Sequence, residues 1–376
     1  MPGAQRPRVL VMGCGGIGGL LTAKLVEAGQ AQVLTVAHDP AIAAQARHAG
    51  LRYTERDTTR CVAAEVVTAL PPDAGTFDFV FLCTQPTQVV EAAINTAPSL
   101  ARDGALVCFQ NGLCEERVAP LVGRERVLGA VVLWGASMVR PARYERTSSG
   151  GFVLGRLDGR VDDPRLGRLA ELLAPAGPVT VTANLAGARW SKLALNCAIS
   201  SLGTLGGARL GSLLRYRFVR RLALEVMSEA VALARSAGVR LEKLAGTVDL
   251  EWVALTPEEA RGPGTPSLVA KHALLLAVGA RYRRLRSSML AAIERGRIPA
   301  VDYLNGEVVR RAAALGRWTP VNARLRTLVW DLWRRQARPG LVLLRRLYAE
   351  TRADATAAVL AGYRGRAGDA LVEVAG

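Results

Sequence analysis

The first third of the chain alternates short apolar runs with segments of helical periodicity. The apolar runs at 8–12, 33–37, 79–83 and 105–109 have the length and composition of buried strands. Between the first two, Leu21, Leu25 and Val26 recur at the spacing of one helix face. Further strands are predicted at 127–134, 151–154 and 179–182. Strands that alternate with helices indicate a parallel sheet, and therefore an α/β fold in this part of the chain.

From about residue 187 the pattern becomes helical and remains so. We place the domain boundary after 182 and expect a sheet-containing domain over 1–182, an all-helical domain over 183–341, and a C-terminal helix and loose tail over 342–376. The stretch 256–267, rich in Pro and Gly, is predicted to be a long loop. A chain of 376 residues with 50% hydrophobic content is long enough to form two such domains.

A glycine motif joins the first predicted strand to the first predicted helix. It consists of six residues, Gly13, Cys14, Gly15, Gly16, Ile17 and Gly18. In the strand-turn-helix context, the first glycine permits a tight turn, the second lets a pyrophosphate approach the backbone, and the third allows close helix packing. A helix N-terminus also offers free N–H groups to an anion. We therefore predict a Rossmann-type dinucleotide site here.

The second predicted strand ends at His38 and Asp39, where such folds contact the adenosine ribose. An Asp at this place favours the 2′-hydroxyl of NAD, whereas an Arg favours the 2′-phosphate of NADP. Asp39 also directly precedes Pro40, so its side chain could instead cap a helix. The residues alone leave both interpretations open.

The net charge of +17 raises the question of nucleic-acid binding. Residues 1–100 carry 7 basic and 8 acidic groups, while residues 201–376 carry 29 and 15, so the excess is C-terminal. The arginines are spread through helical sequence without interleaved aromatics, which favours a solvated basic face. Only four of the 49 basic residues are lysines, which makes each lysine a sharper candidate for proton transfer than any arginine.

The remaining composition narrows the class of protein. The six cysteines form no C-x-x-C pair, so we expect neither a disulfide nor a metal. The longest apolar runs are too short to span a membrane, and the N-terminal residues lack the pattern of a signal peptide. We expect a cytoplasmic protein that binds a small-molecule substrate, with no nucleic-acid or membrane partner. The sequence leaves a homodimer open.

Together with the glycine motif, four segments resemble the ketopantoate reductase family, in matching order and spacing up to about residue 330. They are QNG at 110–112, WSKLALN at 190–196, SSML at 287–290 and DYLNG at 302–306. Lys192 and Asn196 lie four residues apart on a predicted helix and so share one face. From the residues alone this pair could equally belong to a solvated surface.

The resemblance implies a role for each of these groups. Lys192 resembles the general acid that protonates the oxygen of a 2-oxo carbonyl, and Asn111 the group that bridges cofactor and substrate, although Asn-Gly is also an ordinary turn pair. Asn196 and Ser288 resemble substrate-binding donors. Asn305 and Gly306 are interpreted as a helix start. The remaining implied contacts are substrate binding by Ser200 and cofactor binding by Thr84, Gln85, Gln88 and Asn111.

Departures from the family pattern bear on cofactor and substrate. His38 stands in place of an NADP-binding arginine and Gln85 in place of an assisting lysine, which modestly favours NADH over NADPH. Ala300 stands in place of a glutamate that holds the substrate hydroxyl, so ketopantoate itself is doubtful as the substrate. Ser200 and Leu210 replace two asparagines, which indicates a less polar pocket.

We therefore expect an NAD(P)H-dependent reductase of a 2-oxo acid or related carbonyl. Reduction of an imine or an unusual ketone is one alternative. A non-catalytic dinucleotide-binding regulator is another, but such a regulator would have no use for the proton donor Lys192.

Overall fold

The computed structural model describes residues 6–373 apart from 245 and 263. The chain forms two compact units, Met1–Ala188 and Arg189–Gly376. The predicted boundary after residue 182 falls where the last strand ends, and the helix that follows, α6 (Leu185–Gly206), begins in the first unit and continues in the second. The C-terminal segment 342–376 belongs to the second unit.

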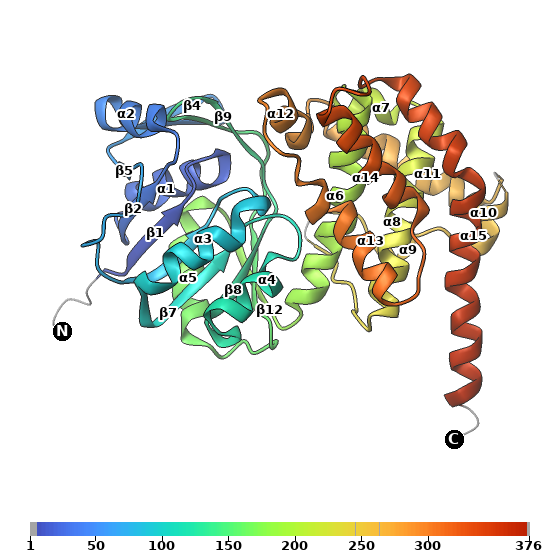
Figure 1. Ribbon diagram of the computed structural model, residues 1–376, viewed down its shortest axis with the longest axis horizontal. Helices are drawn as coiled ribbons and strands as arrows, with labels where there is room; N and C mark the ends of the chain where they lie inside the picture. The colour runs from blue at the N-terminus through green and yellow to red at the C-terminus, as the bar shows by residue number, and fades with distance from the viewer. Residues whose placement is uncertain (1–5, 245, 263, 374–376) are drawn as a thin grey trace. The chain divides into compact units, whose positions relative to one another are not determined.

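An eight-stranded sheet forms the centre of the first unit (Figure 1). All neighbouring strands pair in parallel except β11 with β8, which are antiparallel. Val9, Leu10 and Val11 are fully buried, as expected for a strand covered on both faces. In spatial order the strands are β12 (Val179–Thr182), β11 (Phe152–Arg156), β8 (Val127–Val132), β7 (Leu100–Cys108), β6 (Phe77–Leu82), β1 (Arg8–Met12), β2 (Gln32–Val36) and β5 (Glu65–Val67).

Helices connect most of these strands, the exceptions being β5 to β6 and β8 to β11, and the helix ends follow from local sequence. The first helix ends at Gly29, whose left-handed backbone (φ 63°) returns an N–H to the carbonyls of Leu25 and Val26. The fifth begins with Asp163 as cap and Pro164 in the first helical position. The helices are α1 (Gly16–Ala28), α2 (Pro40–Ala49), α3 (Val89–Thr96), α4 (Cys114–Val122) and α5 (Pro164–Leu173), with short 3-10 turns η1 (Pro86–Gln88), η2 (Ala97–Ser99), η3 (Arg124–Arg126) and η4 (Ala174–Ala176).

A second, four-stranded sheet, which was not predicted from the sequence, packs against α1. Its order is β4 (Thr58–Val62), β3 (Leu51–Glu55), β10 (Arg143–Arg146) and β9 (Ala136–Arg140), and the central pair, β10 with β3, is parallel. Several of its side chains are polar and exposed, so it lacks the apolar runs that mark the strands of the large sheet.

The second unit is helical, as predicted (Figure 1). The expected loop over 256–267 was wrong in part: Pro257 and Pro266 each occupy the first turn of a helix, capped by Thr256 and Thr265. The helices that follow α6 are α7 (Leu210–Leu214), α8 (Arg217–Ser236), α9 (Leu250–Val253), α10 (Pro257–Arg261), α11 (Pro266–Arg281), α12 (Ser288–Glu294), η5 (Ala300–Tyr303), α13 (Asn305–Ala314), α14 (Pro320–Trp333) and α15 (Leu341–Glu373).

The last helix is longer than the sequence suggested. The expected loose tail is helical as far as Glu373, and its last residues, 374–376, lie outside the described part of the chain. No helix in the described part of the chain is both long and apolar enough to cross a membrane. The six cysteines, all of which lie within the described residues, are free thiols.

Candidate active site

Several of the predicted cofactor-binding residues come together at the carboxyl ends of three adjacent strands, β1, β6 and β7. The glycine turn follows β1, Thr84 follows β6 by two residues, and Gln110 follows β7. The Cys83 backbone N–H donates to the Met12 carbonyl (2.8 Å), and the amide nitrogen of Gln110 donates to the Thr84 hydroxyl (3.3 Å). This is the edge at which open parallel sheets bind ligands.

The glycines of the turn serve different purposes. Gly13 has φ +102°, and a Cβ there would lie 2.9 Å from the backbone of Cys83. A Cβ on Gly18 would lie 1.8 Å from the Gly13 carbonyl oxygen, so helix α1 can start this close to the turn only with glycine. A Cβ on Gly15, in contrast, would meet nothing within 4 Å. The fold therefore does not itself require a glycine at position 15, which leaves ligand approach as the reason for one.

The start of α1 provides donors for an anion. The helix begins at Gly16 with Gly15 as its N-cap, and the Gly15 carbonyl accepts the first intrahelical bond, from Gly19 (2.8 Å). The N–H groups of Gly16, Ile17 and Gly18 thus have no partner within the helix. The turn fits the pyrophosphate of a dinucleotide, because these donors and the open space beside Gly15 belong to the same few residues.

The ribose-side residues are exposed. His38 and Asp39 follow β2, and the Asp39 carboxylate caps α2 by accepting from the backbone N–H of Ala41 (3.0 Å). Of the two interpretations of Asp39, the cap is therefore present, and the second carboxylate oxygen is not used by it. Gln85 and Gln88 are exposed at the two ends of η1, and Thr84 is half-buried.

Asn111 is exposed in the turn after β7, next to Gly112, whose φ of +93° is the left-handed conformation of a tight turn. The Asn111 carbonyl accepts a weak hydrogen bond from the thiol of Cys114 (3.5 Å), and its side chain points out of the protein core. Asn111 is thus available to a ligand at the same sheet edge as the glycine turn.

Lys192 belongs to the second unit, on helix α6. It is half-buried, and burial together with the nearby charge of Arg189 lowers the pKa of its ammonium to about 8. An amine with this pKa carries a proton at neutral pH and releases it far more readily than an ordinary lysine. That is the property a general acid requires.

Asn196 and Ser200 follow Lys192 at intervals of four residues and continue the same stripe of α6. The side-chain nitrogen of Asn196 is buried, with no hydrogen-bond partner among the described residues. A buried amide donor without a partner is costly and indicates a ligand or water in its vicinity. The backbone carbonyl of Ser200 accepts from the Ser287 hydroxyl (2.8 Å). Ser288, the predicted substrate donor, is exposed at the start of α12, whereas Ser287 caps that helix.

A buried polar network supports the other side of α6, and most of it could not be predicted from the spacing of its residues. Asn305 does begin helix α13, but its side chain is fully buried and tethers α6. Its amide nitrogen donates to the Cys197 carbonyl (3.3 Å) and to the Asn322 side chain (2.9 Å), and its oxygen accepts from the Ser201 hydroxyl. Asn322 in turn donates to the carboxylate of Glu229 (2.7 Å). The network fixes the turn of α6 that includes Asn196.

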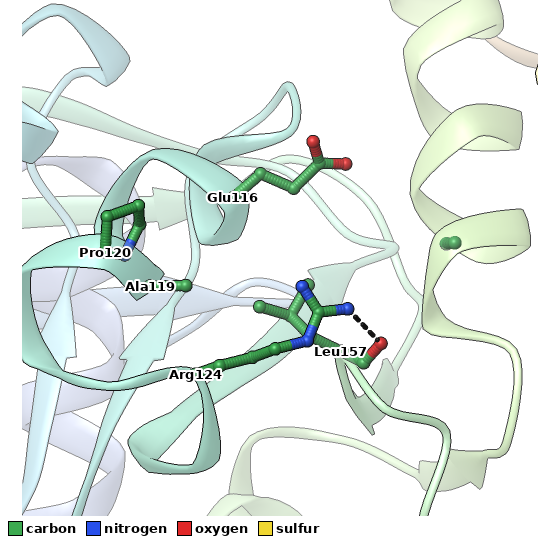
Figure 2. A pocket seen from close by; sticks show the side chains of 6 residues that line it. Glu116, Ala119, Pro120, Arg124 and Leu157 are labelled. Atoms are coloured by element: carbon green, nitrogen blue, oxygen red, sulfur yellow. Dashed lines mark hydrogen bonds between the residues drawn. The ribbon is translucent and has the colours of Figure 1, made fainter.

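The surroundings of Ala300 and the cavity beside α4 are separate from the candidate site residues described above. Ala300 is half-buried at the start of η5, and the neighbouring Asp302 carboxylate accepts from Arg326 (2.5 Å) and so is engaged elsewhere. A cavity of about 560 Å³ lies beside α4. Among its lining residues, Arg124 donates to the carbonyl of Leu157 (2.9 Å; Figure 2). None of its lining residues belongs to the glycine turn or to the Gln110–Gly112 turn.

A Rossmann-type sheet with a glycine turn, followed by an all-helical unit that carries a half-buried lysine, defines a class of dinucleotide-dependent oxidoreductases. Comparison with known families is more specific. The family model described as ketopantoate reductase PanE/ApbA matches residues 9–159, and the model of its C-terminal domain matches residues 184–332. The chain belongs to the ketopantoate reductase family and is an NAD(P)-dependent oxidoreductase that acts on a carbonyl group.

Individual relatives agree with this assignment. The 2-dehydropantoate 2-reductase of Halobacterium salinarum is 28% identical over 336 residues, covering 89% of this chain and all of the relative. That of Pyrococcus horikoshii is 24% identical over 330 residues, covering 86% and 96%. Among solved structures, a PanE/ApbA family ketopantoate reductase from Ralstonia eutropha has a TM-score of 0.71 at 27% identity, covering 88% and 99%. D-mandelate dehydrogenase in complex with NADH and anilino(oxo)acetate shares the fold, with a TM-score of 0.73 at 17% identity, covering 87% and 98%.

Proposed function

We propose that this protein reduces the carbonyl group of a 2-oxo acid with a nicotinamide dinucleotide, and that Lys192 donates the proton. The observation that carries the proposal is the state of Lys192, which is half-buried with a pKa lowered to about 8. One helical turn away, the buried amide of Asn196 has an unused donor among the described residues. Together they offer a proton and a hydrogen bond on one face of α6.

In the first unit, the glycine turn would hold the pyrophosphate through the N–H groups of Gly16, Ile17 and Gly18. Asp39 would accept from an adenosine ribose hydroxyl, and Thr84 and Asn111 would lie beside the remainder of the dinucleotide. The bound nicotinamide supplies the hydride. The protein's own task is to orient the carbonyl and to stabilise the charge that develops on its oxygen.

Lys192 performs that task in two ways. As an ammonium it attracts the carbonyl oxygen as negative charge builds up, and the Nζ proton then passes to that oxygen, which leaves a neutral amine. Solvent can reprotonate the amine at neutral pH, since its pKa is about 8. Asn196 would donate to the substrate and keep it aligned with Lys192.

The substrate proposed is a 2-oxo acid with an apolar substituent rather than ketopantoate. Ala300 offers no carboxylate to a substrate hydroxyl, and Leu210 is a buried hydrocarbon. The fold of D-mandelate dehydrogenase, whose structure holds NADH and anilino(oxo)acetate, supports an aromatic 2-oxo acid as a candidate. The same loss of a polar anchor also favours, as a second candidate, an imine or an unusual ketone.

NADH is proposed as the preferred cofactor by a modest margin. His38 and Gln85 stand where an arginine and a lysine would neutralise a 2′-phosphate, and Asp39 directly follows His38 in the sequence. A 2′-phosphate brought near Asp39 would add like-charge repulsion, whereas a ribose hydroxyl would donate a hydrogen bond to it.

The test of Lys192 compares Lys192→Arg and Lys192→Ala with the parent, at saturating cofactor and against a panel of aliphatic and aromatic 2-oxo acids. Arginine keeps the positive charge but does not release a proton, so both variants should lose about two or more orders of magnitude in kcat. Lys243→Arg is the matched control, because Lys243 is an exposed lysine of the same unit. It should retain full activity.

The pH profile provides a second readout of the same proposal. Reduction requires the protonated ammonium, so kcat/KM should fall as pH rises through about 8, while the reverse oxidation should increase over that range. Activity of Lys192→Arg close to that of the parent would eliminate the proton-donor role. A parent profile that is flat between pH 7 and pH 9 would do the same, since the loss should amount to about tenfold per unit above the pKa.

A further inference from the structure

Tyr144, a residue outside every motif in the sequence, reaches the glycine turn from the second sheet. It lies on β10, and its side chain is 2% exposed. Its hydroxyl donates to the backbone carbonyl of Cys14 (3.0 Å) and lies 3.0 Å from the Cys14 sulfur, so the turn is tied to a strand 130 residues away. The small sheet thus contacts the turn through a specific polar group as well as by packing.

The hydrogen bond from Tyr144 to the Cys14 carbonyl also determines the direction of the neighbouring Gly15 N–H. The C=O of Cys14 and the N–H of Gly15 belong to one planar trans peptide and therefore point in opposite directions. A hydrogen bond that fixes the Cys14 oxygen toward Tyr144 directs the Gly15 N–H away from it. Apart from Gly15 and its two chain neighbours, no atom of the described residues lies within 4 Å of where a Cβ on Gly15 would be, so the turn has room for a ligand there.

The packing around Tyr144 leaves the turn little freedom. A Cβ on Gly19 would lie 2.1 Å from the Tyr144 ring, and a Cβ on Gly16 would lie 2.5 Å from the carbonyl oxygen of Ala136 on β9. Both strands of the β9–β10 hairpin therefore press against the first turn of α1. Burial raises the pKa of the Tyr144 hydroxyl well above its usual range, and it raises that of the Cys14 thiol to about 11. Both groups stay protonated, so the hydroxyl remains a donor throughout the neutral range.

We propose that Tyr144 is a positioning residue for the cofactor. Its hydroxyl holds the Cys14–Gly15 peptide in the orientation that presents the Gly15 N–H, together with the first-turn N–H groups of α1, to the pyrophosphate. The proposal rests on the proposed dinucleotide site at the glycine turn. It assigns to the second sheet a function in cofactor affinity, beyond covering α1.

The chain offers a matched control for removing this hydroxyl. Tyr53 lies on β3 of the same sheet, is 1% exposed, and donates to the carboxylate of Glu27 (2.5 Å) near the other end of α1. Tyr144→Phe and Tyr53→Phe thus each remove one buried tyrosine hydroxyl bonded to the α1 region, but only the first of them touches the turn. Arg60 still donates to Glu27 (2.9 Å) in the control.

The experiment measures NADH dissociation by fluorescence titration, KM and kcat for NADH, and the thermal midpoint of Tyr144→Phe, Tyr53→Phe and Gly15→Val. For Tyr144→Phe we expect a rise in Kd and in KM for NADH of about fivefold to tenfold, because a buried carbonyl loses its partner and the peptide can rotate. At saturating NADH its kcat should remain that of the parent. Tyr53→Phe should lower the thermal midpoint about as much as Tyr144→Phe does, but it should leave the Kd for NADH unchanged.

Each outcome decides between the two proposals. If Gly15→Val abolishes binding while Tyr144→Phe binds NADH as the parent does, the site stands and the positioning role is wrong. Equal weakening by Tyr53→Phe and Tyr144→Phe would also overturn it, since the effect would then come from the stability of α1. If a folded Gly15→Val protein binds NADH normally, the dinucleotide site lies elsewhere and both proposals fail.

Discussion

Substitution of Gly15 separates the requirements of the fold from those of the ligand. The backbone of Gly15 (φ −76°, ψ −163°) is open to any L-residue, and an added Cβ would meet no described residue other than its chain neighbours within 4 Å. Gly15→Val should therefore fold with a thermal midpoint close to that of the parent. The added side chain would occupy the space through which a pyrophosphate approaches the N–H groups of Gly16 and Ile17.

The size of the loss follows from the contacts that are blocked. Each hydrogen bond to a charged group contributes about 1.5–3 kcal/mol, so losing two should cost about 3–6 kcal/mol, or about 10²–10⁴-fold in dinucleotide affinity. Isothermal titration calorimetry with NADH and NADPH measures the loss. Gly167→Val is the control, because Gly167 lies on α5 of the same unit and also has open space around it. Unchanged affinity in a folded Gly15→Val protein would refute the assignment.

Two more predictions test the cofactor preference and the buried network. Initial-rate kinetics should give a modestly higher kcat/KM with NADH than with NADPH, and a clear advantage for NADPH would show that another cation serves the 2′-phosphate. Asn305→Ala removes the hydrogen bonds that this side chain makes with the Cys197 carbonyl, the Ser201 hydroxyl and the Asn322 side-chain oxygen, so it should lower stability by about 2–4 kcal/mol and the calorimetric thermal midpoint by about 4–16 °C. A midpoint within about 1 °C of the parent's would mean that water replaces the lost contacts.

The parts of the fold that the sequence predicted are those with strong local signals. Strands β1, β2 and β6 consist mainly of apolar residues, and the glycine turn between β1 and α1 is specified by six consecutive residues. The helical second unit and the shared helix face of Lys192 and Asn196 follow from periodicity, whereas Ser200 was implied only by the family resemblance. The loop predicted over 256–267 failed in part because proline also begins helices, and the caps Thr256 and Thr265 were overlooked.

The second sheet could not be predicted in the same way. Its central pairing joins β10 to β3, about 90 residues apart, and its outer strands, β4 and β9, are largely exposed. The proposed role of Tyr144 depends on that pairing. In the sequence it corresponds to a glycine at position 19, where a side chain would collide with the Tyr144 ring. The buried chain from Asn305 through Asn322 to Glu229 likewise joins three helices whose contacts no spacing reveals.

The sequence by itself therefore determined which chemical groups this oxidoreductase possesses and on which elements they lie, because strands, turns and helix faces are encoded by neighbouring residues. The tertiary structure decided the pKa, the orientation and the fixed position of those groups. Burial beside Arg189 lowers the pKa of Lys192, the closeness of β10 to the glycine turn fixes a peptide plane through Tyr144, and a network of buried amides holds the α6 turn that bears Asn196. Each of these depends on segments distant in the chain, and therefore on contacts that exist only in the folded protein.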